Sequence, residues 1–325
     1  MVKNLKVRVA IKRREKVVGL ELLSAVSGVL IAIQSRINGA LSEKMGDSLE
    51  AAVVSFSTGL LFVTVIAAFR KDVRTGFSQI FKAVHENKMP PWTLAAGALG
   101  ASFVAMQTYV VPIAGVALFT VASLAGQTGI SLWVDKLALS GGAKTLITKR
   151  RVIAAVITVF AVGVSAWDRF EMSNFSILAL ALAFFAGSWV GVQRALNGRI
   201  NSHSNKSFAT SWLNFITGTS FLLLLLLLRS LFTDHSILNF QTAPWWMFLG
   251  GSIGVIYIAL SAHIVQQLGV LEFTLFSVGG MLIGSLLIDL LFPTPGTFIS
   301  PFLIVGIALT YLGVVANGQS RLSRR

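Results

Sequence analysis

Two similar polar signatures stand at the ends of two long apolar stretches, QSRING at residues 34–39 and QRALNG at residues 193–198. In each, a glutamine and an asparagine are four residues apart, so their side chains share one face of a helix. An amide without a hydrogen-bond partner is costly in hydrocarbon, which directs it toward other helices or a polar path. Gln34, Asn38, Gln193 and Asn197 are therefore candidates to line the two mouths of a path for a polar solute.

Structural roles compete with this hypothesis. Glycine follows each asparagine, and Asn-Gly is a common C-terminal cap of a helix, so we expect Asn38 and Asn197 to cap their helices. Gln34 and Gln193 are equally suited to joining neighbouring helices through hydrogen bonds.

Five more polar residues lie within apolar segments. Tyr109, Gln127 and His263 are further candidates for the solute path, although a lone histidine or tyrosine on such a helix more often packs. Glu21 and Glu272 each lie about one helical turn inside the expected cytoplasmic start of a span, where the positive end of the helix dipole stabilises an anion. If either glutamate is drawn into the bundle, we expect it to bind the proton of an antiport cycle.

The composition places these residues in a lipid bilayer. Hydrophobic residues make up 54% of the 325, charged residues 12%, and the mean hydropathy is +0.77. About 20 helical residues cross a hydrocarbon core of about 30 Å. Apolar runs of that size predict ten spans, at about residues 19–36, 51–69, 92–111, 115–134, 152–167, 175–193, 208–228, 246–265, 270–291 and 302–317.

The basic residues predict the orientation. Alternate connections and tails assign 23 of the 27 Lys and Arg residues to one side and 4 to the other. By the positive-inside rule, both termini are then cytoplasmic. The net charge of +14 is accounted for by this topology and by attraction of the basic N-terminal tail to anionic lipid, so we expect no nucleic-acid partner.

Several kinds of chemistry find no support in the residues. The chain has no cysteine, and its four histidines are scattered without metal-ligand spacing. A nucleotide-binding loop is also absent. We therefore expect no metal, no cofactor and no enzymatic activity.

The chain contains an internal repeat. One set of residues recurs 159 positions later: Gly28, Gln34, Asn38, Gly39, Ser48, Phe56, Thr58 and Gly59. A second set recurs 154 positions later: Pro90, Trp92, Gly97, Gly100, Gly115, Thr120, Gly126, Ser131 and Asp135. Asp135 matches Asp289, and we expect the two to share a structural role. Each half holds five spans, and an odd number inverts the second half in the membrane. We predict a basic cytoplasmic tail at residues 1–18 and five-helix repeats at residues 19–170 and 171–325.

Small residues four apart favour close helix packing. The spacing occurs at Gly28 and Ala32, at Gly187 and Gly191, and at Gly280 and Gly284. Such pairs let two backbones approach closely, and we assign them to helix packing rather than to a ligand.

These features resemble the drug/metabolite transporter superfamily, and within it the YdcZ-like five-span inner-membrane proteins, here joined as two copies. The resemblance rests on the two Gln-x-x-x-Asn-Gly ends, the Pro-x-Trp entries at Pro90 and Pro244, and the pattern from Gly126-Gln127 to Asp135. The second copy has Met281 where the first has Gln127. The resemblance implies an all-α integral membrane fold of ten transmembrane helices in two inverted five-helix repeats.

Inverted repeats favour a secondary transporter that opens a central site to either side in turn. We expect an exporter of small organic metabolites or drugs in the bacterial inner membrane, with proton coupling as a hypothesis. A passive channel is the first alternative, and a membrane-embedded enzyme or assembly subunit the second. A homodimer is compatible with the sequence, although the fusion of two halves removes the need for one.

Overall fold

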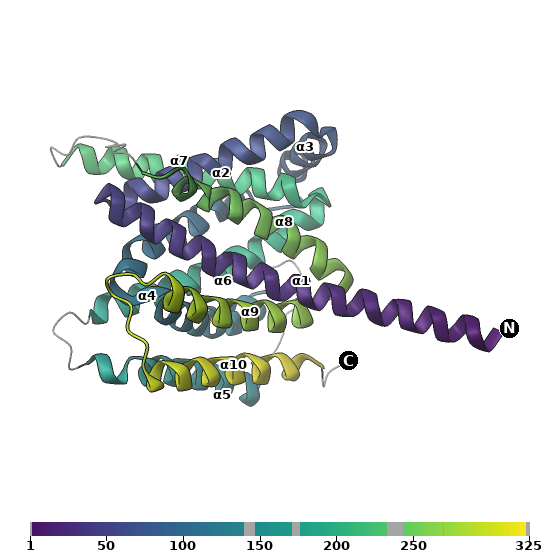
Figure 1. Cartoon of the computed structure of the whole chain (residues 1–325). Helices are drawn as coiled ribbons and strands as arrows, with labels where there is room; N and C mark the ends of the chain where they lie inside the picture. The colour runs from purple at the N-terminus through teal and green to yellow at the C-terminus, as the bar shows by residue number, and fades with distance from the viewer. Residues whose placement is uncertain (1, 140–146, 171–175, 233–242, 269, 323–325) are drawn as a thin grey trace.

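The structure is a computed structural model that describes residues 2–139, 147–170, 176–232, 243–268 and 270–322. Within these ranges all regular secondary structure is helical, and the helices run side by side in one bundle (Figure 1). The elements are α1 (Val2–Met45), α2 (Ser48–Phe69), α3 (Lys71–His85), η1 (Pro91–Ala95), α4 (Ala96–Lys136), α5 (Lys149–Ser165), η2 (Trp167–Arg169), α6 (Ile177–Ser204), α7 (Ser207–Ser230), η3 (Trp245–Leu249), α8 (Gly250–Leu268), α9 (Val270–Leu291) and α10 (Pro301–Leu322).

Seven helical stretches of the described residues are long and apolar enough to cross a membrane, and two shorter apolar ones lie at Trp245–Ser261 and Pro301–Ala316. The stretch Pro91–Val134 has 44 residues. A straight helix of that length would measure about 66 Å, roughly twice the hydrocarbon thickness. Large apolar side chains such as Leu22, Leu61, Phe160 and Leu227 are exposed on the outside of the bundle, as lipid-facing residues should be.

Two helices run past the ends that the Asn-Gly pairs predict. α1 continues through Asn38 to Met45, and α6 continues through Asn197 to Ser204, where Asn205 adopts the left-handed conformation. The capping roles expected of Asn38 and Asn197 are therefore wrong, because both lie in helix interiors. α1 also begins at Val2, so Glu21 is not in its first turn and the N-terminal end of the helix dipole does not stabilise it.

The helix α4 is broken at Gly115, which has φ of 79° and ψ of 165°. Asp289 of α9 closes the break, because its carboxylate accepts hydrogen bonds from the backbone N–H groups of Val116 (2.9 Å) and Ala117 (2.7 Å). A side-chain cap of this kind satisfies N–H donors that begin a helix. Asp289 therefore starts the second half of α4 from a different helix, which is a structural role. The side chain of Asp135, its partner in the repeat, lies outside the described part of the chain.

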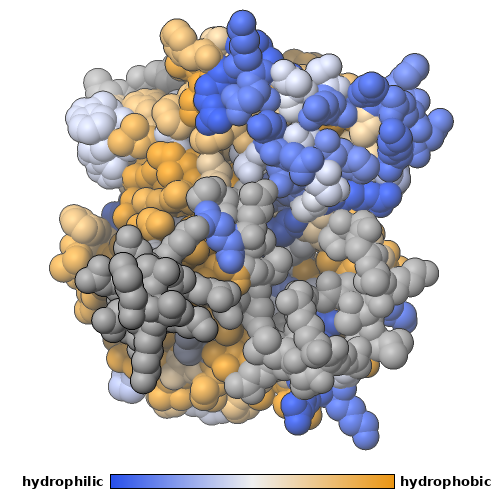
Figure 2. Space-filling model, turned by 90° about the vertical axis from the view of Figure 1, so that its right-hand side faces the viewer, coloured by the Kyte–Doolittle hydropathy of each residue, from blue (hydrophilic) through white to orange (hydrophobic). Residues whose placement is uncertain are grey.

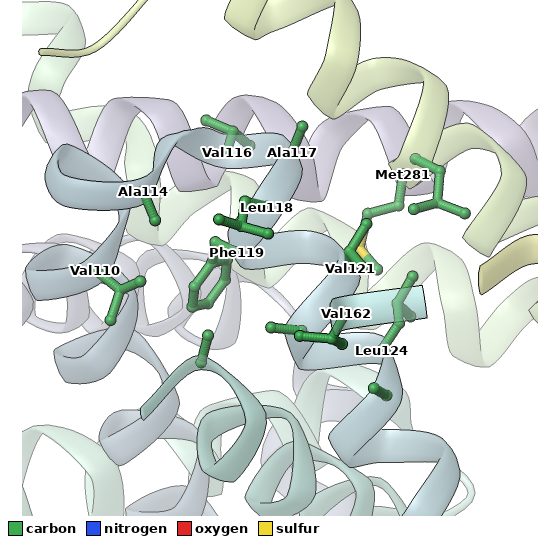
Figure 3. Close-up of a cluster of buried hydrophobic side chains, with 14 of the residues drawn as sticks. Val110, Ala114, Val116, Ala117, Leu118, Phe119, Val121, Leu124, Val162 and Met281 are labelled. Carbon is green, nitrogen blue, oxygen red and sulfur yellow. The ribbon is translucent and has the colours of Figure 1, made fainter. Parts of the chain in front are cut away.

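The break lies against the main hydrophobic core. Figure 3 shows side chains of α4 on both sides of the break, from Val110 to Leu124, converging with Val162 of α5 and Met281 of α9. Arg169 is buried beside the same corner and donates hydrogen bonds to the carbonyl oxygens of Ala114 and Phe298. Arg169 thus joins the break in α4 to the segment that precedes α10.

Several helix pairs approach so closely that only glycine fits between them, and two of these pairs contain glycines predicted from the sequence. α1 packs on α9, where a Cβ built on Gly28 would lie 1.9 Å from the carbonyl oxygen of Ser277. α6 packs on the second half of α4, where a Cβ on Gly187 would lie 1.8 Å from the carbonyl oxygen of Ser123. These two contacts join equivalent positions of the sequence repeat. Gly28 and Gly187 are 159 residues apart, and Ser123 and Ser277 are 154 residues apart.

The other glycines expected at helix contacts are placed similarly. A Cβ on Gly280 would meet the carbonyl oxygen of Ala25, one on Gly284 would meet Val29, and one on Gly191 would meet the side chain of Ile130. At the edge of the bundle, α5 and α10 lie side by side (Figure 1).

The helix α3 was not expected from the sequence. Its buried residues Val73, Gly76, Ile80 and Ala83 recur every three or four positions, and its opposite face carries exposed Lys71, Arg74 and Lys82 among others. This pattern is typical of an amphipathic helix lying on a surface. Figure 2 views the end of the bundle that carries both chain termini, and hydrophilic residues gather in its upper part, where α3 lies in Figure 1.

The glycine contacts predict a sharp stability difference within α6. We expect Gly187→Ala to lower the free energy of unfolding by about 1–3 kcal/mol, because the added methyl group must push α6 away from α4. Thermal unfolding of the purified protein in detergent measures this. Gly198→Ala on the same helix is the matched control, since a Cβ there meets nothing within 4 Å. Equal stability of the two variants would contradict the close approach.

Candidate functional site

A cavity of about 580 Å³ lies inside the bundle and is the candidate site. Seven helices contribute to its described wall: α1, α2, α4, α6, α7, α8 and α9. Its size falls within the range of small-molecule sites. The lining mixes apolar rings with hydroxyl and amide groups, including Gln34, Gln127, Gln193 and Asn197 from the sequence-derived candidates.

The cavity reaches one end of the bundle. Its wall includes Ser202 and Asn205 at the connection between α6 and α7, and both residues are exposed. The described residues around the α1–α2 connection, at Gly46 and Asp47, do not line it. The site is therefore accessible from the end that holds the α6–α7 connection and closed toward the opposite end.

A buried amide network closes the opposite end. Asn38 donates to Gln107 Oε1 at 2.8 Å, and Gln107 Nε2 donates to Ser35 Oγ at 2.8 Å. Asn38 and Gln107 are fully buried, and Gln34 is 8% exposed at the floor of the cavity. Asn38 thus joins α1 to α4 and does not itself line the cavity.

The equivalent residues near the open end are bonded differently. Gln193 donates to Asn214 Oδ1 at 3.0 Å, and Asn214 Nδ2 donates to Asn197 Oδ1 at 2.8 Å. These bonds hold α6 to α7. Ser261, which matches Gln107 in the repeat, bonds only within its own helix, to the carbonyl oxygen of Ile258. Among the described residues, the bond between Asn38 and Gln107 therefore has no counterpart between the equivalent residues Asn197 and Ser261.

Helix packing has the same asymmetry. α1 packs directly along α4, whereas within the described part of the chain α6 makes no comparable contact with α8 or α9. The cavity occupies the space between α6 on one side and α8 and α9 on the other. Equivalent parts of the two halves are thus packed together at one end of the bundle and separated at the other.

Arg194 bridges this separation. Its Nη1 donates to Gln127 Oε1 at 2.7 Å, and its Nη2 donates to the Tyr257 hydroxyl at 3.1 Å. Arg194 lies ten residues, about 15 Å, before the end of α6 at Ser204, and its exposed side chain forms part of the cavity wall. It is the one charged side chain in the described lining of the cavity.

Sequence reasoning missed Arg194 because span six was expected to end at residue 193, which assigned the arginine to a cytoplasmic connection. The available signal was its place between Gln193 and Asn197, within one turn of both candidates. Gln107 and Asn214 were also missed, since only the fold shows which amides they contact.

Other sequence-derived candidates fall outside the cavity. Tyr109 is 41% exposed and faces away from it. Glu21 is half-buried on α1 and does not line the cavity either. The side chains of His263 and Glu272 lie outside the described part of the structure, although Glu272 falls in the first turn of α9.

An ion-pair cluster strengthens the closed end. Arg229, at the end of α7, pairs with Asp47 just before α2 and with Glu50 in its first turn, the latter at 3.3 Å. Glu50 is 4% exposed. Asp47 also caps α2 by accepting from the Glu50 backbone N–H at 2.9 Å. Charged and hydrogen-bonded groups therefore fix the ends of α2 and α7 to each other where the cavity is closed.

The chain matches a known family twice. A family model described as "Putative inner membrane exporter, YdcZ" matches residues 20–164 and again residues 178–316. Chains of solved structures match as well, and one crystal structure covers 96% of this chain and 98% of its own length with a TM-score of 0.52 and 12% sequence identity. At that identity the likeness concerns the fold alone. No curated protein is similar enough to count as a relative.

The difference between the open and the closed end predicts that cysteines introduced at the two ends react at different rates. The chain has no native cysteine that would interfere. We expect Asn197→Cys to react with a water-soluble maleimide at least about tenfold faster than Asn38→Cys, because only the former faces the open cavity. Labelling rates of the purified protein, compared after full denaturation, measure the difference. Faster labelling at Asn38→Cys would contradict the closed end.

Proposed function

The chain belongs to the YdcZ family of inner-membrane exporters, and on that premise we propose that it is a secondary transporter that exports small organic solutes by alternating access. The multi-pass helical fold and the family are its starting points. The observation that carries the proposal is the cavity, which equivalent parts of the two halves close at one end and leave open at the other.

We further propose ten spans in two inverted five-helix repeats. The long helix α4 counts as two crossings on either side of Gly115, and the shorter α8 and α10 count as one each. Support comes from the recurrence of contacts at equivalent positions: Gly28 on Ser277 and Gly187 on Ser123. Phe56 and Phe215 are equivalent as well, and their rings contact each other with centroids 5.0 Å apart. A contact of a position with its own equivalent is expected near a two-fold axis.

The positive-inside rule places both termini in the cytoplasm. The open end of the cavity lies at the same end of the bundle as the termini, so this conformation faces inward (Figure 1). An exporter would load its solute in this state.

The outward-facing state follows from exchanging the roles of the two halves. The Asn38–Gln107 contact would break, and α6 would close on α8 with Asn197 approaching Ser261, the residue equivalent to Gln107. Each half would then adopt the packing that the other half has here.

Two double-cysteine variants test the exchange. We expect Asn38→Cys/Gln107→Cys to crosslink in the inward-facing state and Asn197→Cys/Ser261→Cys in the outward-facing state, and either crosslink to reduce transport by at least about tenfold. Solute flux in proteoliposomes before and after a reducing agent measures the effect, with the four single-cysteine variants as controls.

A passive channel would give a different result. Its flux would not saturate, and it would not need to pass through both the inward-facing and the outward-facing state. Failure of the Asn197→Cys/Ser261→Cys pair to crosslink under every condition, while transport proceeds, would refute alternating access.

We also propose that protons drive export, with Glu21 and Glu272 as the groups that carry them. A carboxyl group in a span is a functional candidate because its charge is costly there. We expect Glu21→Gln/Glu272→Gln to abolish the dependence of transport on an imposed pH gradient. Fluorescence of a pH-sensitive dye inside proteoliposomes is the measurement. Unchanged gradient-driven transport by the double variant would remove both glutamates from the coupling.

A further inference from the structure

We propose that the cavity binds organic oxyanions, in which a carboxylate or phosphate group is held by Arg194 and an apolar body lies against the aromatic wall. The inference rests on the proposed function for the idea that the cavity takes a solute. It adds the chemical class of that solute, which neither the fold nor the family supplies.

The charge of the cavity wall favours an anion. Arg194 is the one charged side chain among the described residues that line the cavity, so none of those residues is an aspartate or a glutamate. Among the described residues its hydrogen-bond partners are Gln127 and Tyr257, which are neutral. A cation at membrane depth is costly unless it is hydrated or paired. An anionic solute would supply the missing negative charge, whereas a cationic solute would be repelled.

The N–H donors of Arg194 have a geometry that suits an oxyanion. The two bonds to Gln127 and Tyr257 fix the guanidinium plane from two different helices and leave its remaining N–H donors unused. A fixed, planar fork of donors matches the two oxygens of a carboxylate or of a phosphate. Tyr257 accepts from Arg194, so its own hydroxyl proton is available to a second oxygen of the same group.

The rest of the wall suits an apolar body. Phe103, Phe119 and Phe215 line the cavity from α4 and α7, and Phe103 and Phe119 lie with ring centroids 5.6 Å apart. Such rings favour contact with an apolar or aromatic body. Ser55 also lines the cavity, is 1% exposed, and its hydroxyl has no hydrogen-bond partner among the described residues. A buried polar group without a partner is costly, so Ser55 marks a second polar contact for the solute.

The opposing explanation is that Arg194 only joins α6 to α4 and to α8. In that case its removal would loosen the helices without changing which charge the cavity accepts. The test therefore needs a readout of charge preference rather than of stability.

The reporter is Gly198→Cys, one turn from Arg194 on the cavity wall, where a Cβ meets nothing within 4 Å. Its labelling rate is measured with methanethiosulfonate ethylsulfonate, an anion, and with the matching trimethylammonium cation. We expect Arg194→Gln to lower the anion-to-cation rate ratio by about tenfold or more, because a unit charge about 6 Å away is removed. Arg194→Lys should keep the ratio. Ser78→Cys on exposed α3 is the control, and its ratio should not respond to Arg194→Gln.

Protection of the same cysteine identifies the bound group. Phenylacetate, phenyl phosphate and phenethylamine carry one ring with a carboxylate, a phosphate or an ammonium group. We expect at least one oxyanion at about 10 mM to slow labelling of Gly198→Cys with the uncharged reagent methyl methanethiosulfonate, and phenethylamine to have no effect. Arg194→Gln and Arg194→Lys should each weaken this protection by about tenfold, the latter because it keeps the charge but loses the fork.

Protection by the carboxylate alone or by the phosphate alone would decide between the two groups, and either outcome supports the proposal. It is overturned by equal protection from the amine, by protection that survives Arg194→Gln, or by no protection from either oxyanion. Failure of the proposed function is separate: oxyanions would still protect, while the crosslinks described above would leave flux unchanged.

Discussion

The architecture depends on close contacts between helix backbones, of which those at Gly28 and Gly187 are two. At Gly28 and at Gly187 no side chain separates the glycine from a carbonyl oxygen of the facing helix, which makes α1 with α9, and α6 with the second half of α4, into tightly packed pairs. In lipid there is little hydrophobic force between helices, so such van der Waals contact is a main source of association. Helices of both pairs line the cavity, together with α2, α7 and α8.

The polar chemistry of the site follows from the same arrangement. Residues at equivalent positions of the repeat face different neighbours: Asn38 bonds across to Gln107, while Asn197 bonds to Asn214 on the adjacent helix α7. Each pattern pairs the amide nitrogen or oxygen of the asparagine with another amide, while Asn38 Oδ1 is buried without a partner among the described residues. The same residue type is thus bonded to a different helix in each half, as two conformations related by an exchange of the halves require.

Much of this was predictable from sequence, and the exceptions have physical causes. Apolar run length located helical segments, and small-residue spacing located the glycines at the helix contacts, because both depend on local pattern. The ends of α1 and α6 were wrong because tertiary contacts extend helices through Asn-Gly pairs that often end one. Arg194 was assigned to a connection for the same reason. The difference between the two ends of the cavity could not be predicted, since a repeat gives both halves the same pattern and only the folded state distinguishes them.

The corner at Gly115 has a mechanical consequence. Asp289 binds the backbone where α4 changes direction, so α9 is attached to α4 by its tip, and the 22 residues of α9 extend from that point. A helix of this length is a lever arm of about 33 Å, on which a rotation of about 10° at the tip moves the far end by roughly 6 Å. If α9 rotates about the Asp289 carboxylate, a small change of its angle therefore gives a displacement of several ångströms at its other end.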